Sequence, residues 1–404
     1  MKSSKIPILF LILVLVAGCG GGGSGTPPPK GSAALANNVL PITVNGSLCS
    51  AGTSTSYLNK PCVSVTVCTP GTSTCQTIND ILLDTGSFGL RIFKQALTTV
   101  SLTQIISGSG SVAECAQFNG GLSEWGPVVL ADVTLGKETA NNVPIQIIDS
   151  TFGTVPSACG TPDATPSAAG FTGILGVGVF VQDCGSVCAN QANNGIYYSC
   201  SGSTCTGITV PLSSQVQNPV VFLPPDNNGV SDNNGVIVEL PTVPSNGSQS
   251  VNGILVLGIS TKTNNVPSGV TAYNTDPIGE ITTSLSGTYS GIIDSGSNGL
   301  FFTPPSPGLL PNCPSPDSAW FCPLSITTLS AKNQGASGSP SGDVFFQIGN
   351  FMSLTKSPNN VFSNIGGSSP GLFAWGLPFY FGRNICVGIE GKASSIGTGP
   401  YFAY

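Results

Sequence analysis

Two near-copies of one short motif constrain the fold of this chain more than any other feature. The motifs are ILLDTGSFGL, with Asp84, and GIIDSGSNGL, with Asp294; five of the seven positions from each Asp to the following Leu are identical. In each copy an apolar run, which predicts a strand, leads into an aspartate, a hydroxyl residue and a glycine, which favour a tight turn. Two such turns that face each other would pair their carboxylates, and paired carboxylates can activate water without a metal or a histidine.

The sequence contains no histidine, which excludes Ser-His and Cys-His triads and the usual His-bearing zinc sites. No Cys-x-x-Cys pair occurs, so neither a zinc ribbon nor a thioredoxin-like site is predicted, and we expect no cofactor and no metal. Asp-Asn-Asn-Gly occurs at 226–229 and at 232–235, a composition that could bind calcium or form ordinary turns. Turns are favoured, because no loop with calcium-ligand spacing and a terminal Glu follows.

The N-terminus resembles the signal of a bacterial lipoprotein. Residues 1–18 combine a basic start with an apolar run too short for a comfortable membrane span, and they lead to Val16-Ala17-Gly18-Cys19. This predicts lipidation of Cys19; the alternative is an ordinary signal peptide followed by a chance cysteine. By the same resemblance, Gly20 implies that the protein passes to the outer membrane, where it faces either the periplasm or the outside. Residues 19–38 then comprise the lipidated cysteine and a flexible Gly/Pro tether.

The charge of the mature chain is low and acidic. Removing Lys2 and Lys5 leaves 12 − 2 = 10 basic residues against 18 acidic ones, a net charge of −8. This balance argues against nucleic acid as a partner and provides no basic patch for anionic lipid. We therefore expect membrane contact only through the lipid anchor, and a monomer.

Short β-rich runs separated by turn residues predict an all-β protein. Gly and Pro together make up 53 + 32 = 85 of the 404 residues, and no long helical periodicity is present. The predicted strands are CVSVTVC, TINDILLD, GPVVLADVTLG, VPIQIID, GVIVELP, GILVLGIS and GDVFFQIG. Short helices are predicted at SITTLSAK and near Phe93–Leu97. The segment 182–214, rich in Cys, Asn, Gly and Ser, reads as a disulfide-stapled loop insertion.

Thirteen cysteines follow Cys19, an odd number in an oxidising compartment. Close spacing favours four local disulfides: Cys68–Cys75, Cys184–Cys188, Cys200–Cys205 and Cys313–Cys322. Cys49–Cys62 and Cys115–Cys159 are weaker pairings from the same reasoning. Cys386, in the apolar run NICVGI, would remain as a buried free thiol.

Beyond the two Asp motifs, the chain resembles the pepsin-like aspartic peptidases, as a bacterial lipoprotein branch of that superfamily. In that family each Asp–hydroxyl–Gly turn, which ends a strand, is followed later in the chain by a second strand that runs beside it and carries two apolar residues and a glycine. Ile174-Leu175-Gly176 and Ala374-Trp375-Gly376 resemble these second strands. CVSVTVCTPGTSTCQTINDILLDTGS resembles the opening hairpin, and NGILVLGIS resembles the strand that crosses between lobes. The resemblance implies a bilobal, double-barrel fold with a cleft between an N-terminal lobe at 39–262, which carries Asp84, and a C-terminal lobe at 263–404, which carries Asp294.

The resemblance also implies roles for the residues of the two turns. Two close carboxylates share a proton because both cannot ionise cheaply; the ionised one takes a proton from water and the protonated one stabilises the oxyanion. Aspartic peptidases are themselves a standard example of this behaviour. The supporting residues are Gly86, Gly296, Ser87 and Ser297, which would donate to the carboxylates, and Thr85 and Ser295, which would bond across to the opposite turn.

Two positions depart from the family pattern. The hairpin that covers the substrate normally carries a tyrosine, but here CAQFNGGLSEWGPVVLADV provides Phe118 and Trp125, each of which could be an apolar lid or part of the core. Arg91 replaces a tryptophan seven residues after Asp84; it could guide an acidic substrate, or form a surface ion pair, which is the favoured reading.

These features predict a lipid-anchored envelope aspartic endopeptidase that cleaves peptides or unfolded proteins. The alternative is a pepsin-fold protein that binds a peptide or glycan without cleaving it, which the altered hairpin favours. A glycoside hydrolase with a carboxylate pair is disfavoured, because it needs a wider carboxylate separation than these turns predict.

Overall fold

The computed structural model describes residues 35–46, 49, 57–118 and 121–404, and residues 36–404 form one compact unit. This unit is built of strands, and its two large sheets carry one Asp motif each, which confirms the predicted all-β, bilobal fold. The α-helices of the described residues are single turns: α1 (Pro166–Ala169), α2 (Ser186–Asn190) and α3 (Phe351–Leu354). None of the helices among these residues has the length and apolar character needed to cross a membrane.

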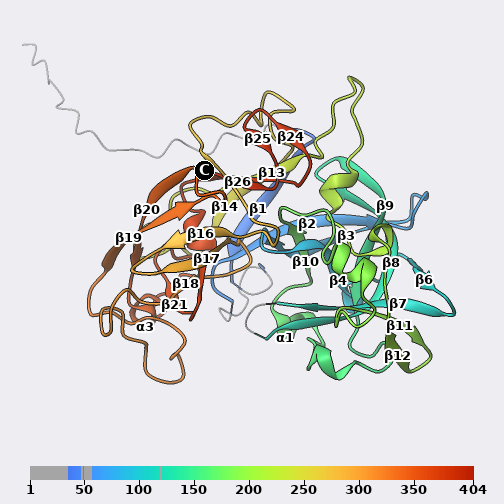
Figure 1. Ribbon diagram of the computed structural model, residues 1–404, viewed down its shortest axis with the longest axis horizontal. Coiled ribbons are helices and arrows are strands. Elements are labelled where there is room, and N and C mark those ends of the chain that lie inside the picture. Colours follow the sequence, from blue (N-terminus) through green and yellow to red (C-terminus); the bar gives the residue numbers. More distant parts are fainter. Residues whose placement is uncertain (1–34, 47–48, 50–56, 119–120) are drawn as a thin grey trace, which may run out of the picture. The chain divides into compact units, whose positions relative to one another are not determined.

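Six strands close into a barrel in the first half of the chain. They are β2 (Lys60–Cys68), β3 (Cys75–Asp84), β10 (Gly173–Val177), β4 (Phe88–Phe93), β9 (Glu138–Ile148) and β8 (Ser123–Leu135), in the order in which they pair, and β8 pairs with β2 again. Figure 1 shows them in blue and green. Val63, Val65 and Val67 are buried, whereas Ser64 between them is exposed, the period-two pattern of a strand with one face in the core.

A hairpin extends from this barrel. Its strands are β7 (Gly110–Gln117) and the first part of β8; β11 (Tyr197–Ser201) pairs with β7, and β12 (Thr204–Gly207) with β11. The short strands β5 (Thr103–Gln104) and β6 (Ile106–Ser107) complete its edges. The segment 182–214 is therefore not simply a loop insertion. Its two strands enlarge the hairpin, because β11 pairs with β7 and buries Tyr197 and Tyr198.

A set of strands from distant parts of the chain links to the barrel through β1. In pairing order they are β15 (Ala272–Asn274), β26 (Tyr401–Ala403), β23 (Asn384–Gly388), β13 (Gly235–Glu239), β14 (Val251–Leu257) and β1 (Val39–Asn45), which pairs with β2. Together with the barrel and the hairpin they make a 17-stranded sheet. The C-terminal strands β23 and β26 thus belong to the same sheet as the strand that carries Asp84.

A separate seven-stranded sheet carries the second Asp motif (orange to red in Figure 1). Its order is β20 (Ser341–Ile348), β19 (Thr327–Gln334), β16 (Ile281–Ser284), β17 (Thr288–Ile293), β22 (Leu372–Trp375), β18 (Leu300–Phe302) and β21 (Gly366–Ser368). The helix predicted at SITTLSAK is wrong, because this segment forms β19. There Ala331 is buried while its neighbours Ser330 and Lys332 are exposed, which is the alternation of a strand with one buried face. Pairing with β20 keeps this alternation in register.

The remaining elements are single 3₁₀ turns and one short two-stranded ribbon. They are η2 (Lys94–Ala96), η3 (Ser157–Cys159), η4 (Leu212–Ser214), η5 (Pro219–Phe222), η6 (Leu377–Phe379) and the two-stranded ribbon of β24 (Ala393–Ser394) and β25 (Gly397–Thr398). The helical turn predicted near Phe93–Leu97 corresponds to η2, a single 3₁₀ turn.

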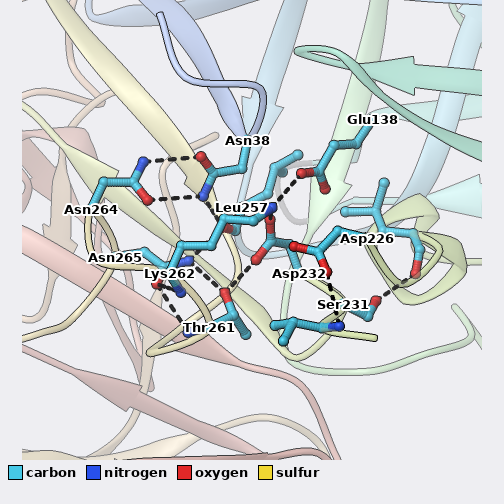
Figure 2. Close-up of polar contacts among 12 residues, drawn as sticks. Asn38, Glu138, Asp226, Ser231, Asp232, Leu257, Thr261, Lys262, Asn264 and Asn265 are labelled. Carbon is cyan, nitrogen blue, oxygen red and sulfur yellow. Dashed lines mark hydrogen bonds and ion pairs between the residues drawn. The ribbon is translucent and has the colours of Figure 1, made fainter. Parts of the chain in front are cut away.

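The two Asp-Asn-Asn-Gly segments serve as turns and ion-pair partners. Asp226 Oδ1 accepts hydrogen bonds from the backbone N–H groups of Asn228 and Val230, which is the turn chemistry expected of this residue. Lys262 forms ion pairs with Asp232 and with Glu138, at 2.8 Å from Glu138 Oε1 (Figure 2). The cluster ties the loop after β14 to β9 and to the segment before β13.

Candidate active site

Asp84 stands at the end of β3 with its carboxylate held by its own turn. The Gly86 N–H donates to Asp84 Oδ1 at 2.8 Å, and the Ser87 hydroxyl donates to Oδ2 at 2.5 Å. The side chain is buried. Both carboxylate oxygens therefore have a local donor on the turn side, and the carboxylate is fixed in one orientation.

Asp294 follows β17 and repeats this arrangement. Its Oδ1 accepts from the N–H groups of Gly296 at 2.8 Å and Ser297 at 3.2 Å, and its Oδ2 accepts from the Ser297 hydroxyl at 2.6 Å. The two copies of the motif thus build two equivalent carboxylate-bearing turns.

A strand that contains a glycine or leads directly into one runs parallel to each of the Asp strands. β10 pairs with β3 so that Gly176 lies opposite Asp84, and β22 pairs with β17 so that Trp375 lies opposite Ile293. A Cβ on Gly176 would lie 2.6 Å from Phe88 N, and a Cβ on Gly376 would lie 2.1 Å from Gly299 O. Only glycine lets these strands approach the turns so closely.

Thr85 and Ser295 join the two turns. The Thr85 hydroxyl donates to Ile293 O at 3.0 Å, and the Ser295 hydroxyl donates to Leu83 O at 2.8 Å. Each hydroxyl thereby binds the strand that delivers the opposite aspartate. Tyr380 OH lies 2.6 Å from Thr85 Oγ1 and adds a third buried contact.

This joining brings the two carboxyl groups together between the turns, where each lies against the glycine of the opposite turn. A Cβ on Gly86 would lie 2.6 Å from Asp294 Cγ, and one on Gly296 would lie 2.7 Å from Asp84 Oδ1, so each turn presents a bare glycine to the opposite carboxyl. The pKa of Asp84 is raised well above its usual value, first by burial and then by the charge of Asp294. A pair of this kind can hold one shared proton and so offer an acid and a base together.

Both carboxyl groups line a cavity of about 680 Å³. Phe118, from the hairpin, is part of its wall, where the sequence places a lid residue. Tyr57 is a cavity residue that the sequence reasoning missed: its hydroxyl donates to Gly296 O at 3.0 Å, and burial followed by the charges of Asp294 and Asp84 raises its pKa. No signal in the sequence points to Tyr57, because it belongs to neither motif and precedes the first strand of the opening hairpin.

Trp125 is not a lid residue, which corrects one of the two readings that the sequence left open. It is fully buried in a cluster with Cys115 and Tyr198, and its indole N–H donates to Phe152 O at 2.7 Å. Strand alternation explains this placement: Trp125 lies opposite Cys115 on one face of the hairpin, whereas its neighbour Glu124 lies on the other face, which borders the cavity.

Arg91 forms a buried ion-pair cluster, not the surface ion pair that its charge predicted. Only 3% of the residue is exposed, and its Nη2 lies 2.5 Å from Glu114 Oε1 and 3.0 Å from Asp183 Oδ2. The side chain is also 5.9 Å from the ring centre of Phe118. All four residues line the same cavity as the two aspartates.

Six disulfides lie within the described residues. Four are the local pairs favoured by close spacing, Cys68–Cys75, Cys184–Cys188, Cys200–Cys205 and Cys313–Cys322; the others are Cys49–Cys62 and Cys115–Cys159. Cys386 is free and buried. Cys19, the predicted lipidation site, lies outside the described residues, as do the signal segment and most of the tether.

Comparisons with known proteins place the chain in a family. A search of curated proteins finds no match. Among solved structures, the crystal structure of an aspartic proteinase from Irpex lacteus is similar with a TM-score of 0.49 and 16% sequence identity; the match covers 90% of this chain and 96% of that one. The model of the family described as "Protein of unknown function (DUF3443)" matches residues 34–404, and the chain belongs to this family.

Proposed function

We propose that this protein is an aspartic endopeptidase that hydrolyses peptides or unfolded proteins with water activated by Asp84 and Asp294. The observation that supports the proposal is the pair of facing carboxyl groups in one cavity, where the neighbour's charge and burial favour a shared proton.

In the proposed reaction the pair shares one proton, which we assign to Asp84 because it is buried whereas Asp294 is only half-buried. Asp294 accepts a proton from a water molecule between the two groups, and that water attacks the peptide carbonyl carbon. Asp84 donates a hydrogen bond to the developing oxyanion. The turn donors from Gly86, Ser87, Gly296 and Ser297 hold the carboxylates in place, so little reorganisation is needed when the charge moves.

The test is hydrolysis of an unfolded protein by the full chain, purified in detergent, at mildly acidic pH. We expect cleavage by the wild type, inhibition by a statine-type transition-state analogue, and a loss of at least about a thousandfold in rate for Asp84→Asn and for Asp294→Asn. The matched control is Asp343→Asn, the same chemical change at an exposed position on β20, which should retain the wild-type rate. Equal rates for the wild type and both active-site variants would overturn the proposal.

The same variants address the alternative function, a pepsin-fold protein that binds a peptide or glycan without cleaving it. Asn keeps the shape of the side chain and most of its hydrogen bonds. A non-catalytic binding protein would therefore show no hydrolysis, and its ligand affinity would change little in either variant.

We also propose that the protein is anchored in the outer membrane through a lipid on Cys19, on the strength of the N-terminal motif. Incorporation of a labelled fatty acid into the wild type and its loss in Cys19→Ser would support this. Equal incorporation into both proteins, or none into either, would contradict it.

A further inference from the structure

The cavity that holds the two aspartates also holds a second group of charged side chains. Glu114, Glu124, Asp183 and Arg91 all line it. They are almost completely inaccessible to solvent: the exposed fraction is 0% for Glu114, 1% for Glu124 and 3% for Arg91. Three carboxyl groups and a single guanidinium group therefore line one cavity with little exposure to bulk water.

The internal contacts of this group leave part of it unsatisfied. Arg91 pairs with Glu114 and Asp183, and Asp183 Oδ1 also accepts a hydrogen bond of 2.7 Å from Tyr197 OH. The Glu124 side chain forms no hydrogen bond or ion pair with any described residue, and Oε2 of both Glu124 and Glu114 is buried without a partner. A buried carboxyl group without a partner is costly, so its presence at a cavity wall indicates that a ligand satisfies it.

The two glutamates lie on the same face of the β7–β8 hairpin. Glu124 lies directly opposite Ala116, and Glu114 is two residues from Ala116 on the same strand, so all three point to one side. Tyr197 of β11 lies opposite Glu114 and continues this row. Because the other face of the hairpin is packed into the core, the carboxyl groups can meet a ligand only from the cavity side.

The charge balance of the group determines which ligand fits. The pKa of Glu124 is raised to about 9, first by burial and then by the charge of Asp163, against the opposing effect of Arg91. Among the described residues that line the cavity, Arg91 is the only cationic one, and it is already shared by Glu114 and Asp183. A positively charged group with several N–H donors would satisfy the free carboxyl oxygens, whereas an acidic group would add repulsion.

The wall next to these carboxyl groups is apolar. Phe118, Leu122, Phe171 and Ile196 line it. A long aliphatic stem that ends in a cationic group matches such a surface, because the stem packs on the apolar side chains while the charge reaches the carboxylates.

We propose that the part of the cavity bounded by Arg91, Glu114, Glu124 and Asp183 is a specificity subsite for a lysine or arginine side chain of the substrate. The bound cation lowers the pKa of Glu124, so that Glu124 releases its proton to solvent and forms the new ion pair, while the free oxygen of Glu114 accepts a further hydrogen bond. This inference rests on the proposed function in that it names the substrate of the same cavity, but it concerns binding and can be tested without hydrolysis.

The test compares two sets of peptides that differ only in lysine or norleucine at one position, scanned along the sequence. Their binding is measured by titration calorimetry on the full chain carrying Asp294→Asn, so that no peptide is consumed. At one position we expect lysine to bind at least about tenfold more tightly than norleucine. Glu124→Gln should bring this ratio close to one, whereas Glu280→Gln, the same change at a residue that does not line the cavity, should leave it intact.

A second variant covers the case in which Glu124→Gln does not fold. Leu122 lines the cavity, is 54% exposed, and lies two residues from Glu124 on the hairpin. Leu122→Lys leaves the buried group untouched and offers a competing ammonium group, so it should also reduce the lysine-to-norleucine ratio.

The outcomes separate this inference from the proposed function. Suppose that the wild type hydrolyses nothing but binds lysine peptides preferentially, and that Glu124→Gln abolishes this preference. This result would support the subsite and contradict the proposed peptidase activity. Three outcomes would overturn the subsite without contradicting the peptidase. They are hydrolysis with no preference for lysine or arginine at any position, a lysine preference that persists in both variants, and a preference for glutamate.

Discussion

Thr85 and Ser295 exchange equivalent hydrogen bonds across the candidate active site. The Thr85 N–H donates to Ser295 Oγ at 3.1 Å, and the Ser295 N–H donates to Thr85 Oγ1 at 3.0 Å. Because both hydroxyl groups also donate to the strands of the opposite motif, the two turns hold each other in register, and the facing of the two carboxyl groups depends on this exchange.

Replacing Thr85 with Val should therefore destabilise the protein while keeping the shape of the side chain. The change removes the acceptor of the Ser295 N–H and the donor to Ile293 O in a buried environment. We expect the free energy of unfolding to fall by about 2 kcal/mol, as measured by denaturant titration. The control is Thr66→Val, which breaks the exposed 2.7 Å contact with Thr77 and should change stability by less than about 0.5 kcal/mol. Equal losses would show that the exchange does not stabilise the site.

The raised pKa of Asp84 predicts how stability depends on pH. A carboxyl group whose folded-state pKa lies above its ordinary value of 3.8 binds its proton more tightly in the folded state. Its contribution to stability is complete below that value and is lost as the pH rises through the folded-state pKa. We expect the wild type to lose stability relative to Asp84→Asn as the pH rises from about 4, in denaturant titrations at a series of pH values. Parallel pH profiles of the two proteins would contradict this.

Removing Arg91 should leave two buried carboxyl groups without a cation. We expect Arg91→Met to lower the free energy of unfolding by about 3–5 kcal/mol at neutral pH. The loss should be smaller at acid pH, because burial raises the pKa of Asp183 and its protonation removes part of the uncompensated charge. Adding Glu114→Gln and Asp183→Asn to this variant should restore part of the stability at neutral pH. A deficit that is independent of pH would point to lost packing instead of lost charge.

The disulfides should differ in their contributions according to the length of the loop that each closes. Cys115–Cys159 spans 44 residues and Cys200–Cys205 spans five, and both lie in the same buried cluster. Loop entropy predicts a loss of about 4 kcal/mol when the first is replaced by two serines and about 2 kcal/mol for the second. Thermal or denaturant unfolding of the two double variants measures the difference. A larger loss for the short loop would show that native-state packing, and not the unfolded chain, dominates.

The sequence by itself determined the features that depend on local chemistry. Alternation in segments such as Val63–Val67 specifies strands, because side chains in a strand point to opposite faces in turn. The Asp-hydroxyl-Gly triplets specify turns for the same local reason, and they repeat at Asp84 and Asp294. Short cysteine spacings specify the local disulfides, because two residues in one hairpin have few other partners within reach. SITTLSAK is the exception, since its pairing with β20 outweighs its local preference.

Only the tertiary structure decided which charged and aromatic side chains the cavity contains. Arg91 is buried because Asp183, 92 residues away in the chain, lies beside it, and Tyr57 reaches Gly296 across 239 residues. Trp125 and Glu124 are adjacent in sequence, yet the strand register sends one into the core and the other to the cavity. The free energy of burying such groups depends on partners that the fold supplies from a distance, and this is why local patterns did not reveal them.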